Sequence, residues 1–196
     1  MICTCTLLRN TLFVLGLLAI RPAFAQQPQL DKFQKGTLEK GRKVGIWQYY
    51  GYTTTGTLTV VQVYDHSTNK LLYFRPLATT TYHTEVKPGE WHYLQPDQPP
   101  LFIGGTEALL TYMSQLVYSR DAQERMLEGK VVITFHIDTL GRVSNYKLAK
   151  GIGLLCDEEA MRVAKVIPQT WVPARVGSHA VAVEYELPFT FRLSGH

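Results

Sequence analysis

Cysteine is scarce in this chain of 196 residues, and its scarcity excludes a fold held together by disulfides. Two of the three cysteines, Cys3 and Cys5, lie in the first few residues, which leaves Cys156 as the only thiol in the remainder. A single thiol cannot cross-link its own chain. Because Cys156 directly precedes the predicted start of a helix, we expect a small packed residue rather than a reactive one.

Sequence signatures of catalysis and of metal binding are also missing. The chain contains no Gly-rich phosphate loop, no Gly-x-Ser-x-Gly elbow, and no His-Glu-x-x-His or paired-cysteine metal motif. His83 and His92 would meet only if a hairpin closed between them, and no third ligand is placed to complete a site. We therefore expect no enzyme activity, no metal and no cofactor.

A strong excess of one charge is absent as well. The formal net charge is +4, and Arg9 and Arg21 supply two of the positive charges within a segment that reads as cleavable. A nearly neutral remainder gives no basis for a nucleic-acid partner.

Residues 1–25 read as a secretory signal peptide. Arg9 precedes an apolar run from Leu12 to Ile20, and Ala23-Phe24-Ala25 supplies small residues for cleavage before Gln26. The alternative is an uncleaved membrane anchor, but an apolar helix of this length spans only about 14 Å of a hydrocarbon core of about 30 Å. Cleavage and a location in the periplasm or cell envelope are favoured, and membrane association is expected only if the segment is kept.

Residues 26–94 predict a small β-meander, because short alternating runs are separated by turn residues. Further runs around Tyr82 and Trp91 are expected to extend it. Trp47, Tyr49 and Tyr64 are expected to form its core, and binding of a glycan or peptide by these aromatic residues is the alternative. The pattern Gly-x-Trp-x-Tyr-Tyr, then Gly-x-Leu, then Tyr-Asp resembles the MORN-like repeats of the YwqK antitoxin-type family, with one unit visible.

A short linker and a helix are predicted after the meander. Residues 95–100 are rich in proline and glutamine and read as the linker to a second domain, residues 101–196. A helix is expected from Thr106, its N-cap, to Val117, with an apolar face that comprises Leu109, Leu110, Met113, Leu116 and Val117.

Residues 129–167 predict a β-hairpin followed by a helix. Apolar residues alternate from Val131 to Ile137, residues 138–141 supply a turn with glycine where a positive φ is needed, and a return strand runs from about Val143 to Ala149. Asp157 is the expected N-cap of the helix, and Pro168 ends it. Its apolar face comprises Ala160, Val163, Ala164 and Ile167.

The last part of the chain predicts one long, half-buried strand. Alternate residues of this strand are apolar: Val181, Val183, Tyr185, Leu187, Phe189, Phe191 and Leu193. Pro188 cannot donate a ladder hydrogen bond, so we expect the strand at a sheet edge or at a bulge. The predicted fold class is α+β: a C-terminal β-β-α-β domain with a three-stranded antiparallel sheet and a packed helix, preceded by a small β-meander.

In this order and spacing, residues 99–193 resemble the C-terminal domain of the TonB family. The matching positions include Gly129 at the first strand, Asp138 and Gly141 at the turn, Asp157 at the helix, Trp171-x-Pro173 after it and Leu187-Pro188-x-x-Phe191 near the end. The lead-in Pro100–Gly105 also fits. Two positions depart from the pattern: Ile103 stands where proline is usual, and Tyr118-Ser119 where Tyr-Pro is usual.

The resemblance implies a periplasmic interaction module, in which an extended segment of an outer-membrane or envelope protein adds to the sheet beside the last strand. On that basis the expected partner-binding residues are Val181, Ala182, Val183, Glu184, Tyr185, Glu186, Leu187 and Thr190. Glu184, Glu186 and Thr190 point outward and are expected to adjust specificity. The family's energy transducers also have an inner-membrane anchor and a long linker, so the fold and the transducing role are separate expectations.

An alternative from another class is a structural envelope protein whose edge is already covered. Dimer exchange or the helix that begins at Thr106 would supply the cover, and a homodimer is therefore left open.

Overall fold

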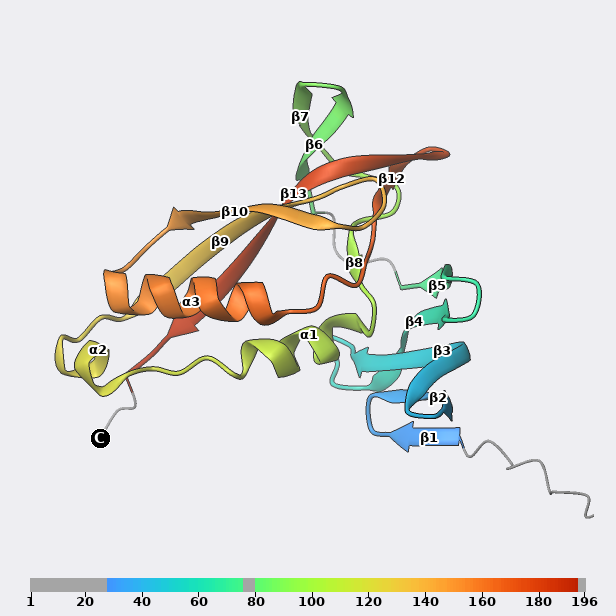
Figure 1. Ribbon diagram of the computed structural model, residues 1–196, viewed down its shortest axis with the longest axis horizontal. Helices are drawn as coiled ribbons and strands as arrows, with labels where there is room; N and C mark the ends of the chain where they lie inside the picture. Colours follow the sequence, from blue (N-terminus) through green and yellow to red (C-terminus); the bar gives the residue numbers. More distant parts are fainter. Residues whose placement is uncertain (1–27, 76–79, 194–196) are drawn as a thin grey trace, which may run out of the picture.

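The N-terminal half forms an antiparallel meander, as its turn spacing predicts. A computed structural model describes residues 28–75 and 80–193, so the expected signal segment lies outside the described residues. Five strands follow one another in chain order: β1 (Pro28–Asp31), β2 (Gln34–Glu39), β3 (Arg42–Tyr52), β4 (Leu58–Asp65) and β5 (Lys70–Phe74) (Figure 1). Trp47, Tyr49 and Tyr64 are 0%, 1% and 6% exposed, which confirms that they form the core of this sheet.

The second sheet is wider than the three strands that the sequence predicts. Its order is β10-β9-β13-β6-β7, with β12 paired to β13 off this path. These strands comprise β6 (Tyr82–Lys87), β7 (Glu90–Leu94), β9 (Gly129–Ile137), β10 (Val143–Lys150), β12 (Ala174–Val176) and β13 (His179–Phe191). The expected strands are thus adjacent, but the β6–β7 hairpin joins them instead of extending the meander. An unpaired strand edge can pair with any strand that reaches it. Nothing in the local sequence of the β6–β7 hairpin specifies that it should pair with β13.

The helices lie below the second sheet in Figure 1. The helix α3 (Leu154–Val166) packs on β9, and α1 (Gly105–Met113) lies between α3 and β3. A single turn, α2 (Arg120–Glu124), follows α1. The main core lies between this sheet and the helices, and its fully buried residues include Ile133, Ile137, Val163, Val183 and Phe189.

Both helix starts differ from the predictions. The structure begins α1 at Gly105, and its N-cap, Gly104, has no side-chain capping bond. It begins α3 at Leu154, so Asp157 lies inside the helix; its Oδ1 accepts the Ile152 amide at 2.9 Å. Asp157 therefore satisfies backbone donors just before the helix from within its first turns, which leaves Gly153 as the N-cap.

The first helix also ends four residues earlier than predicted. The Ser114 hydroxyl donates to the Thr111 carbonyl at 2.8 Å, and the Val117 amide donates to Glu159 Oε1 at 2.7 Å. The Ser114 amide keeps its helical bond to the Leu110 carbonyl, but the amides of Gln115 and Leu116 bond to carbonyls three residues back. The Val117 amide uses Glu159 instead of a helical carbonyl, so the helix ends.

The segment between the two sheets joins them tightly. A two-stranded sheet pairs β8 (Leu101–Phe102) with β11 (Trp171–Val172). Buried Gln62 of β4 donates through Nε2 to the Phe102 carbonyl at 3.2 Å and accepts the Gly104 amide through Oε1 at 2.8 Å. Val172 belongs to the aromatic core of the meander, so that core is completed by a residue of the C-terminal half.

Candidate functional site

The strand β13 alternates between buried and accessible residues, as its sequence predicts. The buried apolar residues on its core face are Val181, Val183, Leu187, Phe189 and Phe191. Glu186, Pro188 and Thr190 are exposed on the other face. One face of the strand is therefore committed to the core, and the other remains accessible.

The two edges of β13 are occupied to different extents. Along one edge, β9 pairs with Val183 to Phe191 without a break. Along the other, β6 pairs only with Ala182, Val183 and Glu184. The first three residues of β13 form a hairpin with β12. From Tyr185 to Phe191 no other strand among the described residues pairs with the second edge. We call this stretch the open edge.

The expected partner-binding residues fall into two groups. Val181 pairs with Ala174 of β12, and Ala182, Val183 and Glu184 lie beside β6. Tyr185, Glu186, Leu187 and Thr190 lie along the open edge. The Glu184 carboxylate is 3.0 Å from His83 Nδ1 on β6, so it already has a partner within the chain.

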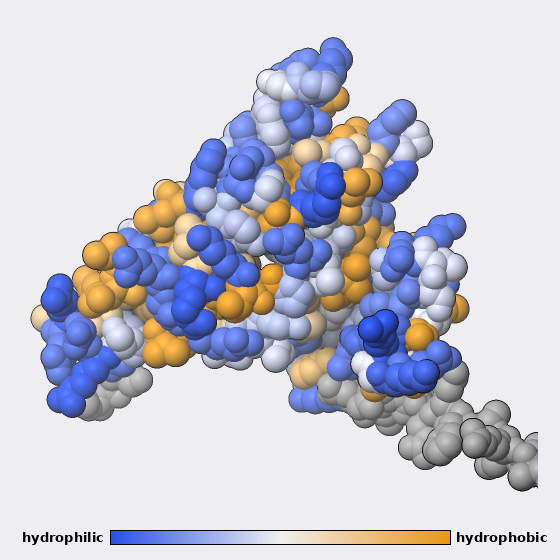
Figure 2. All heavy atoms as spheres, viewed as in Figure 1, coloured by the Kyte–Doolittle hydropathy of each residue, from blue (hydrophilic) through white to orange (hydrophobic). Residues whose placement is uncertain are grey.

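The hairpin beside Glu184 is lightly packed. Tyr93 of β7 is 74% exposed, and the space-filling view shows a mainly hydrophilic tip projecting from a body where apolar residues gather (Figure 2). Pairing with β13 therefore contributes much of what holds the hairpin in place. The sequence contains no signal for this docking.

Pro188 shows which backbone groups the open edge presents. It pairs with Val132 of β9. A hydrogen-bonded antiparallel pair exchanges two bonds, and proline could supply only one of them. An intact ladder therefore requires Pro188 to form a non-hydrogen-bonded pair, with its carbonyl directed to the open edge. Glu186 and Thr190 share its parity, so their amides and carbonyls point the same way.

Two hollows include residues of β13 in their lining. One of about 380 Å³ is lined by Leu116, Tyr118, Thr190, Phe191 and Arg192. Tyr118 packs edge-on against Phe191 at 5.3 Å between ring centroids, which places the Tyr118-Ser119 position beside the end of β13. The other, of about 360 Å³, is lined mainly by residues of the meander, α1 and the segment before α1, and Tyr185 is the one residue of β13 that lines it.

Tyr185 anchors the start of the open edge. Its ring lies 4.9 Å from that of Trp171 and 5.4 Å from that of Phe135, measured between centroids. Burial, with a smaller contribution from Tyr82, raises the pKa of Tyr185 to about 12. The phenol therefore stays neutral across the physiological pH range.

The remaining motif residues shape the sheet and its turn. Gly129 begins β9 with φ +144°, and Gly141 closes the β9–β10 turn with φ +78°. Asp138 Oδ1 accepts the amides of Leu140 and Arg142 at 2.8 and 2.9 Å. Burial acts to raise the pKa of Asp138, but the Arg142 amide and guanidinium outweigh it and hold that pKa below its usual value.

Residues 95–100 are bound to the β12–β13 hairpin. Gln98 Nε2 donates to the Pro173 carbonyl at 2.8 Å, and the Gly177 amide donates to Asp97 Oδ2 at 2.6 Å. The stretch with the composition of a linker thus lies against the C-terminal half.

Cys156 is 1% exposed, which confirms the expected packed thiol. Within residues 28–75 and 80–193, no cluster of three or more His, Cys, Asp or Glu could hold a metal ion. No helix in the same ranges is long and apolar enough to cross a membrane.

One comparison with known proteins identifies part of the chain. Residues 114–193 match the model of a family described as the Gram-negative bacterial TonB protein C-terminal. The match begins after the Pro100–Gly105 lead-in and does not cover the meander, whose MORN-like resemblance stays a prediction. Searches of curated proteins and of solved structures found no match. The matched family is a non-catalytic interaction domain of envelope-associated proteins. The similarity of residues 114–193 to the TonB C-terminal family is thus carried by the hairpin, the helix and the last strand, as their motifs predict.

Proposed function

We propose that this protein is a periplasmic interaction module that captures an extended segment of an envelope partner along the open edge. The observation that carries the proposal is the unequal pairing of β13, which leaves residues 185–191 with one edge available. Addition of a strand to such an edge relies on main-chain hydrogen bonds and needs no special side-chain chemistry. The TonB C-terminal match supports an outer-membrane protein as the source of that segment.

The short length of the open edge predicts that the complex with a partner segment is weak and reversible. The parity of Pro188 leaves two hydrogen bonds to Glu186, two to Thr190 and one to the Pro188 carbonyl for an added strand. At a net value of about 1 kcal/mol each, they supply about 5 kcal/mol before the costs of association. Side chains of the partner that enter the hollow beside Phe191 would add to this. We therefore expect a dissociation constant of about 10⁻⁴ M or weaker.

The proposal is tested with peptides copied from the periplasmic N-termini of outer-membrane receptors. In NMR titrations the amide shifts are expected to concentrate in residues 185–191, because the added strand pairs there. The amides of Ala182 to Glu184 should move less, since β6 already occupies their edge. Uniform shifts, or none at millimolar peptide, would contradict the proposal.

Two substitutions of Thr190 separate backbone from side-chain binding. Thr190→Pro removes an amide that faces the open edge and, by the parity of Pro188, leaves the ladder to β9 intact. We expect it to weaken peptide binding about fivefold to tenfold, the value of one hydrogen bond. Thr190→Val keeps the amide and should change binding less than twofold. An equal loss in both variants would show that the hydroxyl, not the backbone, carries the contact.

Coverage of the edge by β6 gives the structural alternative a specific basis. In that case a second copy of the chain would pair with residues 185–191 and form a homodimer. A mass that rises with protein concentration, together with amides of Glu186 and Thr190 protected from exchange without peptide, would favour the dimer over the peptide-binding module.

A further inference from the structure

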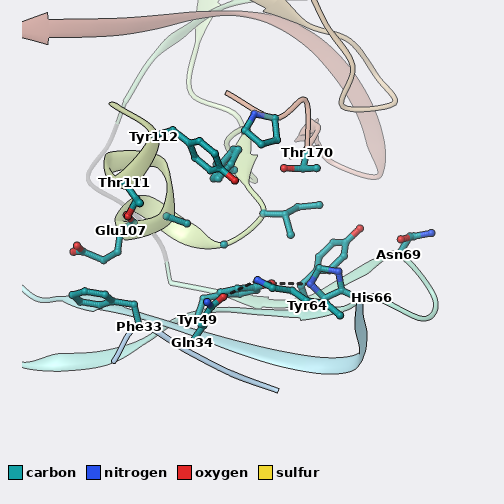
Figure 3. Close-up of a pocket in the computed structure, with 16 residues that line it drawn as sticks. Phe33, Gln34, Tyr49, Tyr64, His66, Asn69, Glu107, Thr111, Tyr112 and Thr170 are labelled. Atoms are coloured by element: carbon teal, nitrogen blue, oxygen red, sulfur yellow. Dashed lines mark hydrogen bonds between the residues drawn. The ribbon is translucent and has the colours of Figure 1, made fainter. Parts of the chain in front are cut away.

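A cleft of about 610 Å³ lies between the meander, α1 and the segment that follows α3 (Figure 3). It is separate from the open edge, since it shares no lining residue with β13. Its floor is the face of β3 and β4, where Tyr49 is almost fully buried. Its volume lies within the range of small-molecule sites, about 300–1,000 Å³.

A hydrogen-bonded group fixes the floor of the cleft. The Tyr49 hydroxyl lies 2.7 Å from His66 Nε2 and 3.2 Å from Lys43 Nζ, and Lys43 also donates to Gln34 Oε1 at 2.7 Å. The Lys43 ammonium sits over the rings of Trp47 and Tyr49, 4.4 and 4.7 Å from their centroids. Burial, and then the charge of Lys43, lower the pKa of His66, which keeps its imidazole neutral.

Polar groups on the walls have no such partners. The side chains of Tyr64, Asn69, Glu107 and Thr170 line the cleft. They come from β4, the β4–β5 turn, α1 and the segment after α3. None of their polar atoms makes a hydrogen bond within the part of the chain that the structure describes. Together they present hydroxyl, amide and carboxylate groups, which offer both donors and acceptors.

The charges that line the cleft nearly cancel. Among the lining residues Lys43 contributes one positive charge and Glu107 one negative charge. Lys32 lies outside the lining, with its ammonium 5.1 Å from the centroid of Phe33, and its charge interacts with Glu107. A ligand with a large net charge would therefore meet as much repulsion as attraction. Phe33, Tyr64 and Tyr112 add aromatic surface next to these polar groups.

We propose that this cleft binds a neutral carbohydrate. Sugar hydroxyls both donate and accept hydrogen bonds, which matches the mixed groups of Tyr64, Asn69, Glu107 and Thr170. The apolar C–H faces of a sugar ring pack against aromatic side chains, and Phe33 and Tyr112 supply such surfaces. The volume is sufficient for one to two sugar rings. The site does not depend on peptide binding at the open edge.

The test is a binding experiment on the full chain with defined probes. Glucose-, galactose-, mannose- and N-acetylglucosamine-based mono- to trisaccharides are titrated to 20 mM and followed by amide NMR shifts. Zwitterionic triglycine and anionic glucuronate serve as comparisons. At least one neutral saccharide is expected to give saturable shifts at His66, Asn69 and Glu107, while residues 185–191 stay unchanged. No saturable saccharide binding in the cleft, or tighter binding of triglycine or glucuronate, would overturn the proposal.

Two variants locate the binding site. Tyr64→Phe removes one hydroxyl and retains the ring, and Asn69→Gly removes the amide at a residue whose φ of +53° suits glycine. Each is expected to weaken saccharide binding at least fivefold. Tyr73→Phe makes the same change on β5 at an exposed residue outside the cleft and should leave binding within a factor of 1.5. Equal affinity in Tyr64→Phe and Tyr73→Phe would place the ligand elsewhere and overturn the proposal.

Discussion

Replacement of Gly141 by alanine is expected to lower the free energy of unfolding by about 2–5 kcal/mol. The residue has φ +78°, a conformation that costs a non-glycine residue about 1–2 kcal/mol. A Cβ atom added there would also lie 2.0 Å from the Trp171 carbonyl oxygen. Backbone cannot move aside as a flexible side chain can, so the β9–β10 turn or β11 must shift, at a cost of about 1–3 kcal/mol more.

Gly89 provides a matched control for this effect. It also has φ +78°, and a Cβ added there would meet no atom within 4 Å. Gly89→Ala should therefore cost only the conformational part, about 1 kcal/mol. Chemical denaturation of both variants measures the difference. If they prove equally stable, the approach of Trp171 to Gly141 is not a constraint on the fold.

Asp138 and Gly141 show why the sequence could predict the β9–β10 hairpin. Its turn is determined locally: Asp138 accepts amides two and four residues ahead, and the positive φ of Gly141 is within glycine's ordinary range. The alternation of β13 is equally local, because it depends only on residue spacing along one strand. Both predictions are confirmed by the buried residues.

The unexpected features depend on contacts between distant segments. His83 and Glu184 are 101 residues apart in the chain, and no pattern in either strand indicates that β6 pairs with β13. The extent of the open edge could therefore not be predicted, although the strand itself could. The cleft is a similar case, because its walls come from β4, α1 and the segment after α3, which only the folded chain brings together.

The predicted starts of the two helices were wrong for a different reason. Acidic residues are common both as N-caps and inside the first turns, so Asp157 fitted either position. The structure places it inside α3, where its carboxylate reaches back to the Ile152 amide. At α1, residue type favours Thr106 as the cap, yet the structure places the cap two residues earlier, at Gly104.

Gln62→Leu is expected to lower the free energy of unfolding by about 2–4 kcal/mol and to loosen the junction between the two sheets. Gln62 is 2% exposed and is the hydrogen-bond acceptor of the Gly104 amide. Leucine would fill similar space but leave that buried donor without a partner, at a cost of about 1–3 kcal/mol. The Phe102 carbonyl would also lose one donor, for about 1 kcal/mol.

The control for this variant is Gln115→Leu, the same substitution at an exposed residue after α1 whose side chain has no hydrogen bond among the described residues. It should change the free energy of unfolding by less than about 0.5 kcal/mol, as is usual for substitutions at surface sites. Hydrogen exchange provides the second measurement: in Gln62→Leu, amides of β3 and β4 should lose protection before those of β9 and β13 do. The meander completes its core with Val172 from the C-terminal half, so weakening this junction should expose that core first. Equal loss of protection in both sheets would mean that they unfold as one unit whether or not Gln62 bridges them.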